Sequence, residues 1–260
     1  MSEDYQCIAS SNNADWTTPF SPPLYLDPNK RYEIALVSFD AYNTVPNITG
    51  ANNTFVYSTD DGATWKTIII PEGSYEITQI NASIQHKLEQ NKDWNSAAAT
   101  HYISIKPNYS TLCTTINITG EKYQIDMTRS TISSVFGFNG QILKRGFHNS
   151  EHPVNILSIS SFLIHCDLVS GSYLNGRAEP IIYSFFPNVS PGYKIVQSPF
   201  NLVYLPVSRT GSVNQIRMWL TDQVGNQLNL RGETITIRLH IRSRSSFDQL
   251  LHVYMGSRSK

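Results

Sequence analysis

The chain has 260 residues, within the upper range for one β domain and also enough for two smaller ones. Its formal net charge is zero, so the overall charge does not indicate a nucleic-acid or membrane binder. Only 15% of its residues are charged, against about 25% in an average globular protein, and Asn, Ser and Thr fill polar positions instead. This composition suits a β-rich protein with neutral faces, either as a monomer or buried against other subunits.

The start of the chain is polar and carries Glu3 and Asp4 without an apolar core, so we predict no signal peptide and no secretion. No apolar run approaches membrane-spanning length, so we expect no membrane partner. The three cysteines, Cys7, Cys113 and Cys166, are odd in number and widely spaced. They are typical of reduced intracellular thiols rather than of a disulfide framework or a metal cluster.

Residues 1–23 are polar and contain prolines, which predicts a flexible N-terminal arm. Trp16 and Phe20 are the only large apolar groups in this arm. They either dock on a neighbouring subunit or fold back on their own domain, and the sequence leaves both interpretations open.

Residues 24–145 are predicted to form an N-terminal β region that contains one helix, over residues 75–90. Alternating or continuous apolar runs predict strands at 32–42, 55–57, 65–70, 102–105, 112–118 and 123–127. In the helix, Ser74 is the expected N-cap. Its apolar stripe consists of Ile77, Ile80, Ile84 and Leu88. We expect the stripe to cover one end of a sandwich rather than to bind a partner.

The loop at 140–151 shows no period and is the best internal boundary in the sequence. Residues 146–242 then contain strand-forming runs at 154–168 and 181–186, and a run at 202–207 in which Pro206 indicates a strand edge. Short strands with a single helix and many Gly, Pro and Asn turns predict an all-β, jelly-roll β-sandwich.

The stretch from 213 to 241 has the clearest period of two and predicts a β-meander with one apolar face. Trp219 is the unusual member of the opposite face, where an isolated sheet would carry a polar group, and Arg217 and Arg238 are expected to flank it. An aromatic side chain beside arginines is typical of a subunit contact. Cover by another segment of the same chain is the alternative. The candidate interface residues are Trp219, Arg217, Arg238, Trp16 and Phe20.

No arrangement of residues predicts catalysis, a bound cofactor or a metal site. Gly171-Ser172-Tyr173 lacks the second glycine of a nucleophile elbow. His148 and His152 are followed by Pro153 in a loop, which is unsuited to a zinc helix. We therefore expect a protein without enzymatic activity. The C-terminal tail, residues 243–260, is basic and either contacts packaged DNA weakly or is simply solvated.

Six phrases along the chain are similar to a known family. They read YEIALVSFDAYNTVPNI, IPEGSYEITQIN, VSGSYLNGR, PGYKIV, NLVYLPV and RGETITIRLHIR. In this order they resemble the minor capsid (penton) proteins of Polinton/Maverick elements and adintoviruses, which are virus-like DNA transposons of animal genomes. The family is similar to virophage pentons and, more distantly, to the adenovirus penton base.

The resemblance implies a structural penton protein of a virion. Five copies would close each icosahedral vertex as a homopentamer, and a double-jelly-roll major capsid protein would be the partner. The jelly roll would be built from strands near both termini, and the middle of the chain would hold an inserted or second β subdomain. Before assembly the protein would be in the cytoplasm or nucleus.

Two further classes of protein remain open from the residues alone. A lectin- or adhesin-like β-sandwich would bind carbohydrate or protein through its loops, with tryptophans stacking on sugar rings. A hydrolase built on a β-sandwich is the other class, and the sequence lacks paired carboxylates at convincing positions for it.

Overall fold

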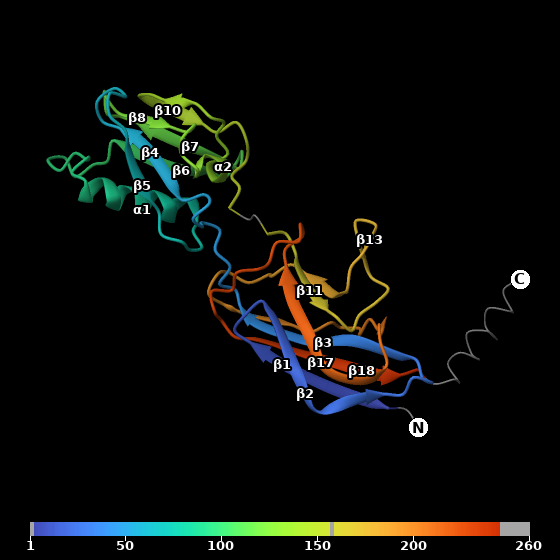
Figure 1. Cartoon of the computed structure of the whole chain (residues 1–260). Helices are drawn as coiled ribbons and strands as arrows, with labels where there is room; N and C mark the ends of the chain where they lie inside the picture. The colour runs from blue at the N-terminus through green and yellow to red at the C-terminus, as the bar shows by residue number, and fades with distance from the viewer. Residues whose placement is uncertain (1–2, 157–158, 245–260) are drawn as a thin grey trace, which may run out of the picture. The chain divides into compact units, whose positions relative to one another are not determined.

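The computed structural model describes residues 3–156 and 159–244, and it shows a mainly β protein (Figure 1). The described residues of Met1–Val45 and Ile159–Lys260 form one compact unit, unit 1, and those of Pro46–Ser158 form a second, unit 2. Each unit has its own apolar core. Because the chain leaves unit 1 after its third strand and later returns to it, unit 2 is an insertion within unit 1.

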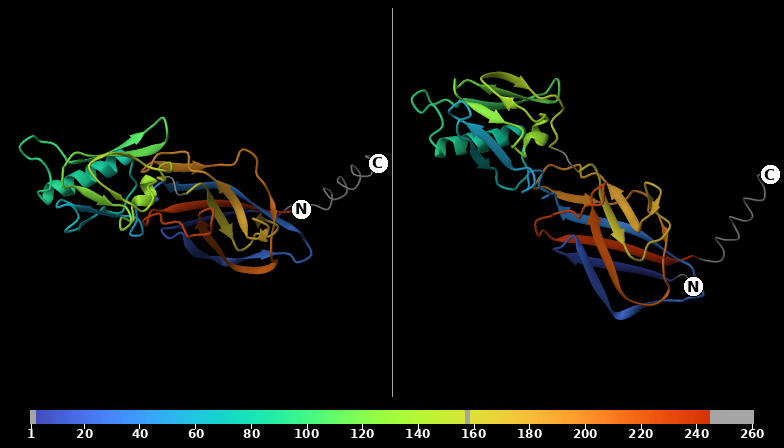
Figure 2. Two further views of the ribbon diagram at one scale, coloured as in Figure 1. Left: turned by 90° about the horizontal axis from the view of Figure 1, so that it is seen from above. Right: turned by 45° about the horizontal axis from the view of Figure 1, so that its top comes forward.

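Unit 1 is a sandwich of two antiparallel sheets (Figures 1 and 2). Sheet 1 has the order β1-β18-β3-β15, with β16 also paired to β3, and sheet 2 has the order β14-β11-β17-β2. The first strand lies beside the last, and the second beside the last but one, which is the wrapping of an eight-stranded jelly roll. The jelly-roll expectation is confirmed.

The strands of sheet 1 are β1 (Asp4–Ser11), β18 (Ile235–Ser243), β3 (Tyr32–Tyr42), β15 (Lys194–Gln197) and β16 (Leu205–Pro206). The strands of sheet 2 are β14 (Ile181–Phe185), β11 (Phe162–Cys166), β17 (Gly211–Thr221) and β2 (Asp15–Leu26). A small hairpin, β12 (Tyr173–Leu174) and β13 (Arg177–Ala178), completes the unit.

The meander expected over 213–241 is wrong. β17 and β18 lie in opposite sheets and do not pair, and the segment between them crosses from one sheet to the other. Leu228 and Leu230 in this crossing segment are buried, but no strand contains them. The period of two correctly gave the buried side of each strand, because alternation reports which face is covered and carries no information on which strands pair.

The N-terminal arm is also corrected. Residues 4–11 and 15–26 are strands β1 and β2, each at the edge of a sheet. Tyr5, Cys7 and Ala9 alternate toward the core of unit 1, a pattern that the polar residues between them concealed. Ser243 ends β18, and residues 245–260 of the predicted tail lie outside the described residues.

The predicted boundary at 145–146 does not coincide with a boundary of either unit, since the units divide at 45–46 and 158–159. The stretch around residue 145 instead continues unit 2. There β9 (Ile142–Leu143) pairs with β8 (Gln124–Asp126), and β10 (Gly146–Asn149) pairs with β7 (Cys113–Ile118). Very short strands of this kind leave little period to detect.

Unit 2 combines two small antiparallel sheets with a helix. One sheet has the order β5-β4-β8-β9 and the other β10-β7-β6. The strands not yet given are β4 (Thr54–Ser58), β5 (Lys66–Ile69) and β6 (Ile103–Asn108), and the helices are α1 (Ile77–Gln90) and α2 (Ser133–Phe136). Neither helix in the described part of the chain has the length and apolarity to cross a bilayer.

The predicted helix is confirmed as α1, with its four-residue apolar stripe fully buried. Its N-cap is Glu76 rather than Ser74. The Glu76 carboxylate accepts from the backbone of Gln79, and the Gln79 side chain accepts from the backbone N–H of Glu76 at 2.8 Å. This reciprocal capping box satisfies two backbone donors at once, an advantage that a lone serine lacks.

Candidate interaction surfaces

The described residues offer little for covalent or metal chemistry. No group of three or more His, Cys, Asp or Glu side chains among them is placed to hold a metal ion. The three cysteines are free thiols. Burial raises the pKa of Cys166 to about 12 and also raises that of Cys7, so both thiols are protonated at neutral pH and poor nucleophiles. The features that remain are sheet faces and grooves.

The outer face of sheet 2 carries a cluster of aromatic and charged side chains. Trp219 on β17 lies between Asp15 on β2 and His165 on β11. The Arg217 guanidinium donates to both Asp15 carboxylate oxygens at 2.9 and 2.6 Å, and this hydrogen-bonded pair holds the pKa of Asp15 below its usual value. The same guanidinium lies 4.9 Å from the centroid of the Trp219 ring. The Asp15 carboxylate and the Trp219 ring therefore hold the arginine in one orientation.

His165 supports this cluster from the neighbouring strand. Its ring stacks on Trp219 with centroids 4.9 Å apart and planes 11° apart. His165 is only 4% exposed, and its Nε2 lies 2.9 Å from the hydroxyl of Thr221. Burial lowers the pKa of His165, so the ring is neutral at pH 7. Trp219 is thus partly exposed, and one face of its ring packs on the imidazole.

The outer face of sheet 1 is a ladder of opposite charges. Glu33 pairs with Arg242 at 3.2 Å and with Arg244 at 3.5 Å, and Asp40 pairs with Lys194 at 3.6 Å. Arg238 is exposed, and no ion pair holds it within the described chain. Opposite it on β1 lies Ile8, which is 57% exposed.

The predicted interface residues do not form one surface. Arg217 and Trp219 lie on the outer face of sheet 2, whereas Arg238 lies on the outer face of sheet 1, since β17 and β18 belong to opposite sheets. Trp16 is 9% exposed within the core of unit 1, opposite Met218, and Phe20 packs partly buried against that core. The structure therefore shows that the two arm aromatics fold back on their own unit.

Exposed apolar residues beside sheet 1 were missed by sequence reasoning. Val196, Phe200 and Val203 are all strongly exposed, and the segment between β15 and β16 that carries two of them runs along the edge of β3. Tyr204 anchors this segment, because its hydroxyl lies 2.6 Å from Nδ1 of His240. The segment has no periodicity, so only exposure in the folded chain reveals it.

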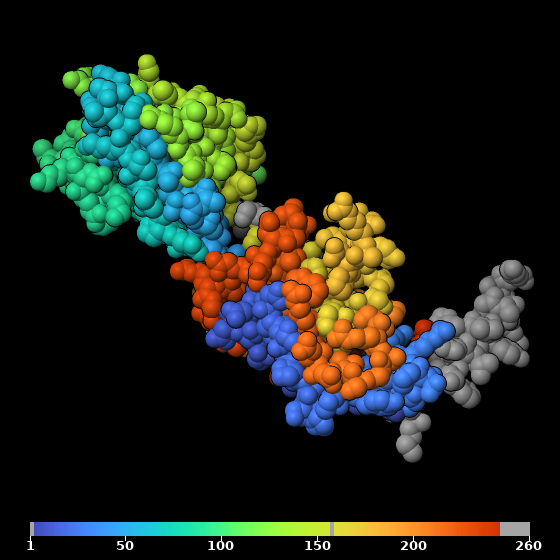
Figure 3. Space-filling model, in the orientation of Figure 1, coloured from blue at the N-terminus to red at the C-terminus, as the bar shows by residue number. Residues whose placement is uncertain are grey.

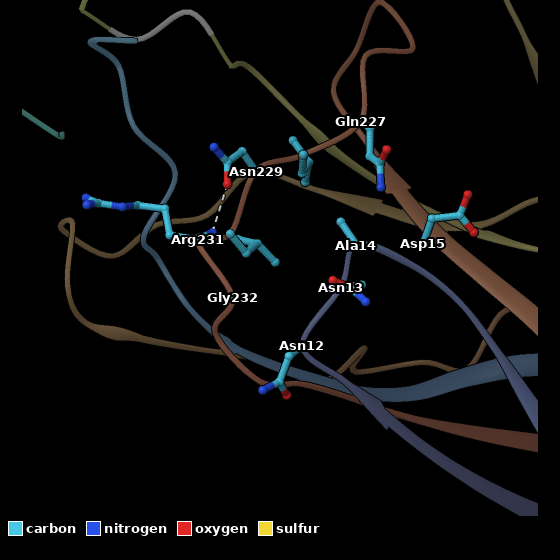
Figure 4. A pocket seen from close by; sticks show the side chains of 10 residues that line it. Asn12, Asn13, Ala14, Asp15, Gln227, Asn229, Arg231 and Gly232 are labelled. Atoms are coloured by element: carbon cyan, nitrogen blue, oxygen red, sulfur yellow. Dashed lines mark hydrogen bonds between the residues drawn. The ribbon is translucent and has the colours of Figure 1, made fainter. Parts of the chain in front are cut away.

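A polar pocket of about 420 Å³ lies between the β1–β2 turn and the loop before β18 (Figure 4). Asn12, Asn13, Gln227 and Asn229 line it with amides, together with the backbone of Arg231. The backbone N–H of Arg231 donates to the Asn229 side-chain oxygen at 2.9 Å. Such a pocket offers hydrogen bonds in several directions but no aromatic platform.

These observations define a class: a jelly-roll protein with a β domain inserted between β3 and β11. Among solved structures, the chain is similar to the mavirus penton protein, with 13% sequence identity and a TM-score of 0.51. The similarity covers 94% of this chain and 100% of the mavirus protein, which shows a shared fold. No family model matches the chain, and no curated protein matches it.

Proposed function

We propose that the chain is a structural minor capsid (penton) protein. Five copies form each vertex of an icosahedral virus-like particle, and the particle is encoded by an integrated DNA element of the Polinton/Maverick or adintovirus kind. The observation that carries the proposal is the extent of the likeness to the mavirus penton, which includes the whole of that chain and nearly all of this one. A β-sandwich without an inserted domain would match over unit 1 alone.

A closed ring needs two different patches on each subunit, because its contacts are head-to-tail. The two outer sheet faces of unit 1 supply them. One carries the Asp15–Arg217–Trp219 cluster, and the other carries Arg238 beside exposed Ile8. Tryptophan and arginine are the residue types that contribute most at interface centres. In this proposal Trp219, Arg217 and Arg238 are interface residues, and Trp16 and Phe20 support the fold behind them.

The proposed partner outside the ring is a double-jelly-roll major capsid protein, and the place of action is the virion. Light scattering after size-exclusion chromatography tests ring formation, and co-expression with the major capsid protein tests vertex formation. A chain that stays monomeric at high concentration and does not join particles would contradict the proposal.

Carbohydrate binding is the second candidate function, and the amide-lined pocket in Figure 4 is the observation that favours it. Its weakness is the lack of an aromatic ring for stacking on a sugar face. A glycan array is the test. Specific binding that is lost in Asn229→Ala would support this function, and an array without signal would remove it.

A further inference from the structure

A second groove, the edge groove, runs between β1 and β2, which are the edge strands of the two sheets on the same side of unit 1. It measures about 770 Å³. Ile8, Phe20 and Leu24 give its wall an apolar part, and Asp4 and Asp27 make one end acidic. Glu3 also lies at this end, but its carboxylate is already paired with Lys30 at 2.5 Å. In the space-filling view the N-terminal strands, coloured blue, form open surface of unit 1 (Figure 3).

The two strands that bound this groove differ in their ability to accept a further strand. β2 contains Pro19, Pro22 and Pro23, which lack backbone N–H groups, so its edge is blocked. β1 contains no proline and pairs only with β18 among the described strands.

The backbone register shows which groups of β1 are open. The Ser243 backbone N–H donates to the carbonyl of Glu3 at 2.8 Å. Because hydrogen-bonded positions alternate along an antiparallel pair, Gln6 and Ile8 turn their backbone groups away from β18 and toward the groove. The groove therefore has an unpaired hydrogen-bonding edge beside an apolar wall, which is the arrangement that receives an added strand.

The C-terminal segment, residues 245–260, has the matching chemistry. Its sequence, SSFDQLLHVYMGSRSK with Ser245 first, has an apolar middle and a basic end at Arg258 and Lys260. A strand laid antiparallel to β1 runs toward Glu3. Its apolar middle then covers Ile8, and its basic end meets the acidic end of the groove.

The position of the last described residue indicates which copy supplies the segment. The Arg244 backbone N–H donates to the carbonyl of Arg31 at 2.7 Å, and Ser243 is bonded to Glu3, so the last described residue lies at the acidic end of the groove. To pair antiparallel with its own β1, the segment would first have to travel back along an eight-residue strand, about 27 Å at roughly 3.4 Å per residue. That return would use about half of the segment's sixteen residues, including Phe247, Leu250 and Leu251 of its apolar middle.

We propose that the edge groove binds the C-terminal segment of a second copy of this chain, added to β1 as an antiparallel strand. In the ring, each subunit then holds the tail of its neighbour. The inference deepens the proposed assembly and rests on it for the identity of the second copy as a ring neighbour.

A directional disulfide test distinguishes a tail bound by a second copy of the chain from a tail bound by its own copy. The first copy ends at Arg244 and carries Gln6→Cys, at an exposed position that lines the groove, with Cys7→Ser, Cys113→Ser and Cys166→Ala. The second copy carries the full tail with Cys7→Ser, Cys113→Ser, Cys166→Ala and one cysteine from a scan of Leu251→Cys, Val253→Cys and Met255→Cys. Oxidation of the mixture is expected to give a covalent heterodimer for at least one scan position. No heterodimer at any of the three positions would overturn the proposal.

A peptide test measures the same contact without assembly. A fluorescent peptide of residues 245–260 is expected to bind the chain truncated after Arg244, with at least a tenfold loss for Gln6→Pro, which removes a groove-facing donor but no bond to β18. The matched variant Gln6→Ala retains that donor and should keep its affinity. A scrambled peptide that binds the truncated chain as tightly as the native peptide would overturn the inference. A native peptide that binds DNA but not the truncated chain would also overturn it.

The outcomes distinguish this inference from the proposed function. Rings formed by a chain whose peptide does not bind the groove would defeat the tail exchange and leave the penton proposal standing. A bound peptide together with a full-length chain that never assembles would defeat the penton ring and leave the groove as a peptide site.

Discussion

Trp219 and Trp16 lie on the two faces of sheet 2, and they are expected to respond differently to truncation. Trp219→Ala should leave unit 1 folded, because the ring is only partly buried and lies outside the apolar core of the unit. It should weaken self-association by on the order of 2 kcal/mol per contact. Light scattering at matched concentrations measures this change.

Trp16→Ala is the matched control, since Trp16 lies within the core of unit 1. It should destabilise the monomer by about 3–5 kcal/mol in urea unfolding. If Trp219→Ala instead showed the instability expected of Trp16→Ala and assembled normally, Trp219 would belong to the core and not to a contact.

His165 gives the fold a specific pH dependence. Burial lowers its pKa in the folded chain below the ordinary value of about 6.5, and the smaller attraction of Glu179 opposes this only in part. The unfolded chain therefore takes up its proton at a higher pH than the folded chain does. The stability due to neutral His165 is complete above about pH 6.5 and is lost as the pH falls through the folded pKa.

We expect His165→Gln to show a smaller loss of stability than the parent chain between pH 7.5 and pH 5.5. Urea unfolding at both pH values measures the difference, and each chain serves as its own reference. Identical pH dependence in the two chains would show that protonation of His165 does not oppose folding.

At the scale of elements, β18 has an inner and an outer face with opposite tolerance to substitution. Ile237 is fully buried between the sheets of unit 1, so Ile237→Asp would bury a carboxylate without a partner and cost several kcal/mol, enough to prevent folding. Arg238→Ser, one residue further on the outer face, should leave the stability of the monomer nearly unchanged. Circular dichroism and urea unfolding of the two variants test the assignment of faces, which normal folding of Ile237→Asp would refute.

Helix α1 belongs to the separate core of unit 2, so damage to it should remain local. Leu88 is fully buried there, and Leu88→Ala should cost about 2–5 kcal/mol. Calorimetry should show two unfolding transitions, of which only that of unit 2 moves to lower temperature. A common shift of both transitions would show that the two cores unfold as one.

The elements show what local sequence can and cannot predict. Strand β3 has the predicted bounds of 32–42, and the stripe of α1 is buried as expected, because each has its period written in consecutive residues. Strand pairing was not predictable. The neighbours of β18 are β1 and β3, whose paired residues lie at least 196 positions away in the chain, and no local pattern encodes that choice.

The candidate interface was predictable only in part. Arg217 and Trp219 do lie together, since they are two residues apart on one strand. Their stacking partner, His165, comes from another strand, and no sequence signal links it to Trp219. The edge groove was missed altogether, because it depends on β1 and β2 being edges of different sheets.

At the scale of the whole molecule, the low charge of the chain agrees with a protein whose sheet faces are covered by other subunits. The insertion of unit 2 between β3 and β11 is a non-local feature of the jelly roll, and the resemblance to penton proteins implied it where the residues alone misplaced the boundary. The outer faces of unit 1 and its edge groove are the surfaces on which assembly depends in this account.

Electron microscopy of this chain co-expressed with the double-jelly-roll major capsid protein would show whether it is a vertex protein. We expect closed particles with five copies of the chain at each five-fold vertex, and vertices that are empty when Trp219→Ala replaces the parent chain. Particles whose vertices never contain the chain, while the chain itself remains monomeric in solution, would contradict this expectation.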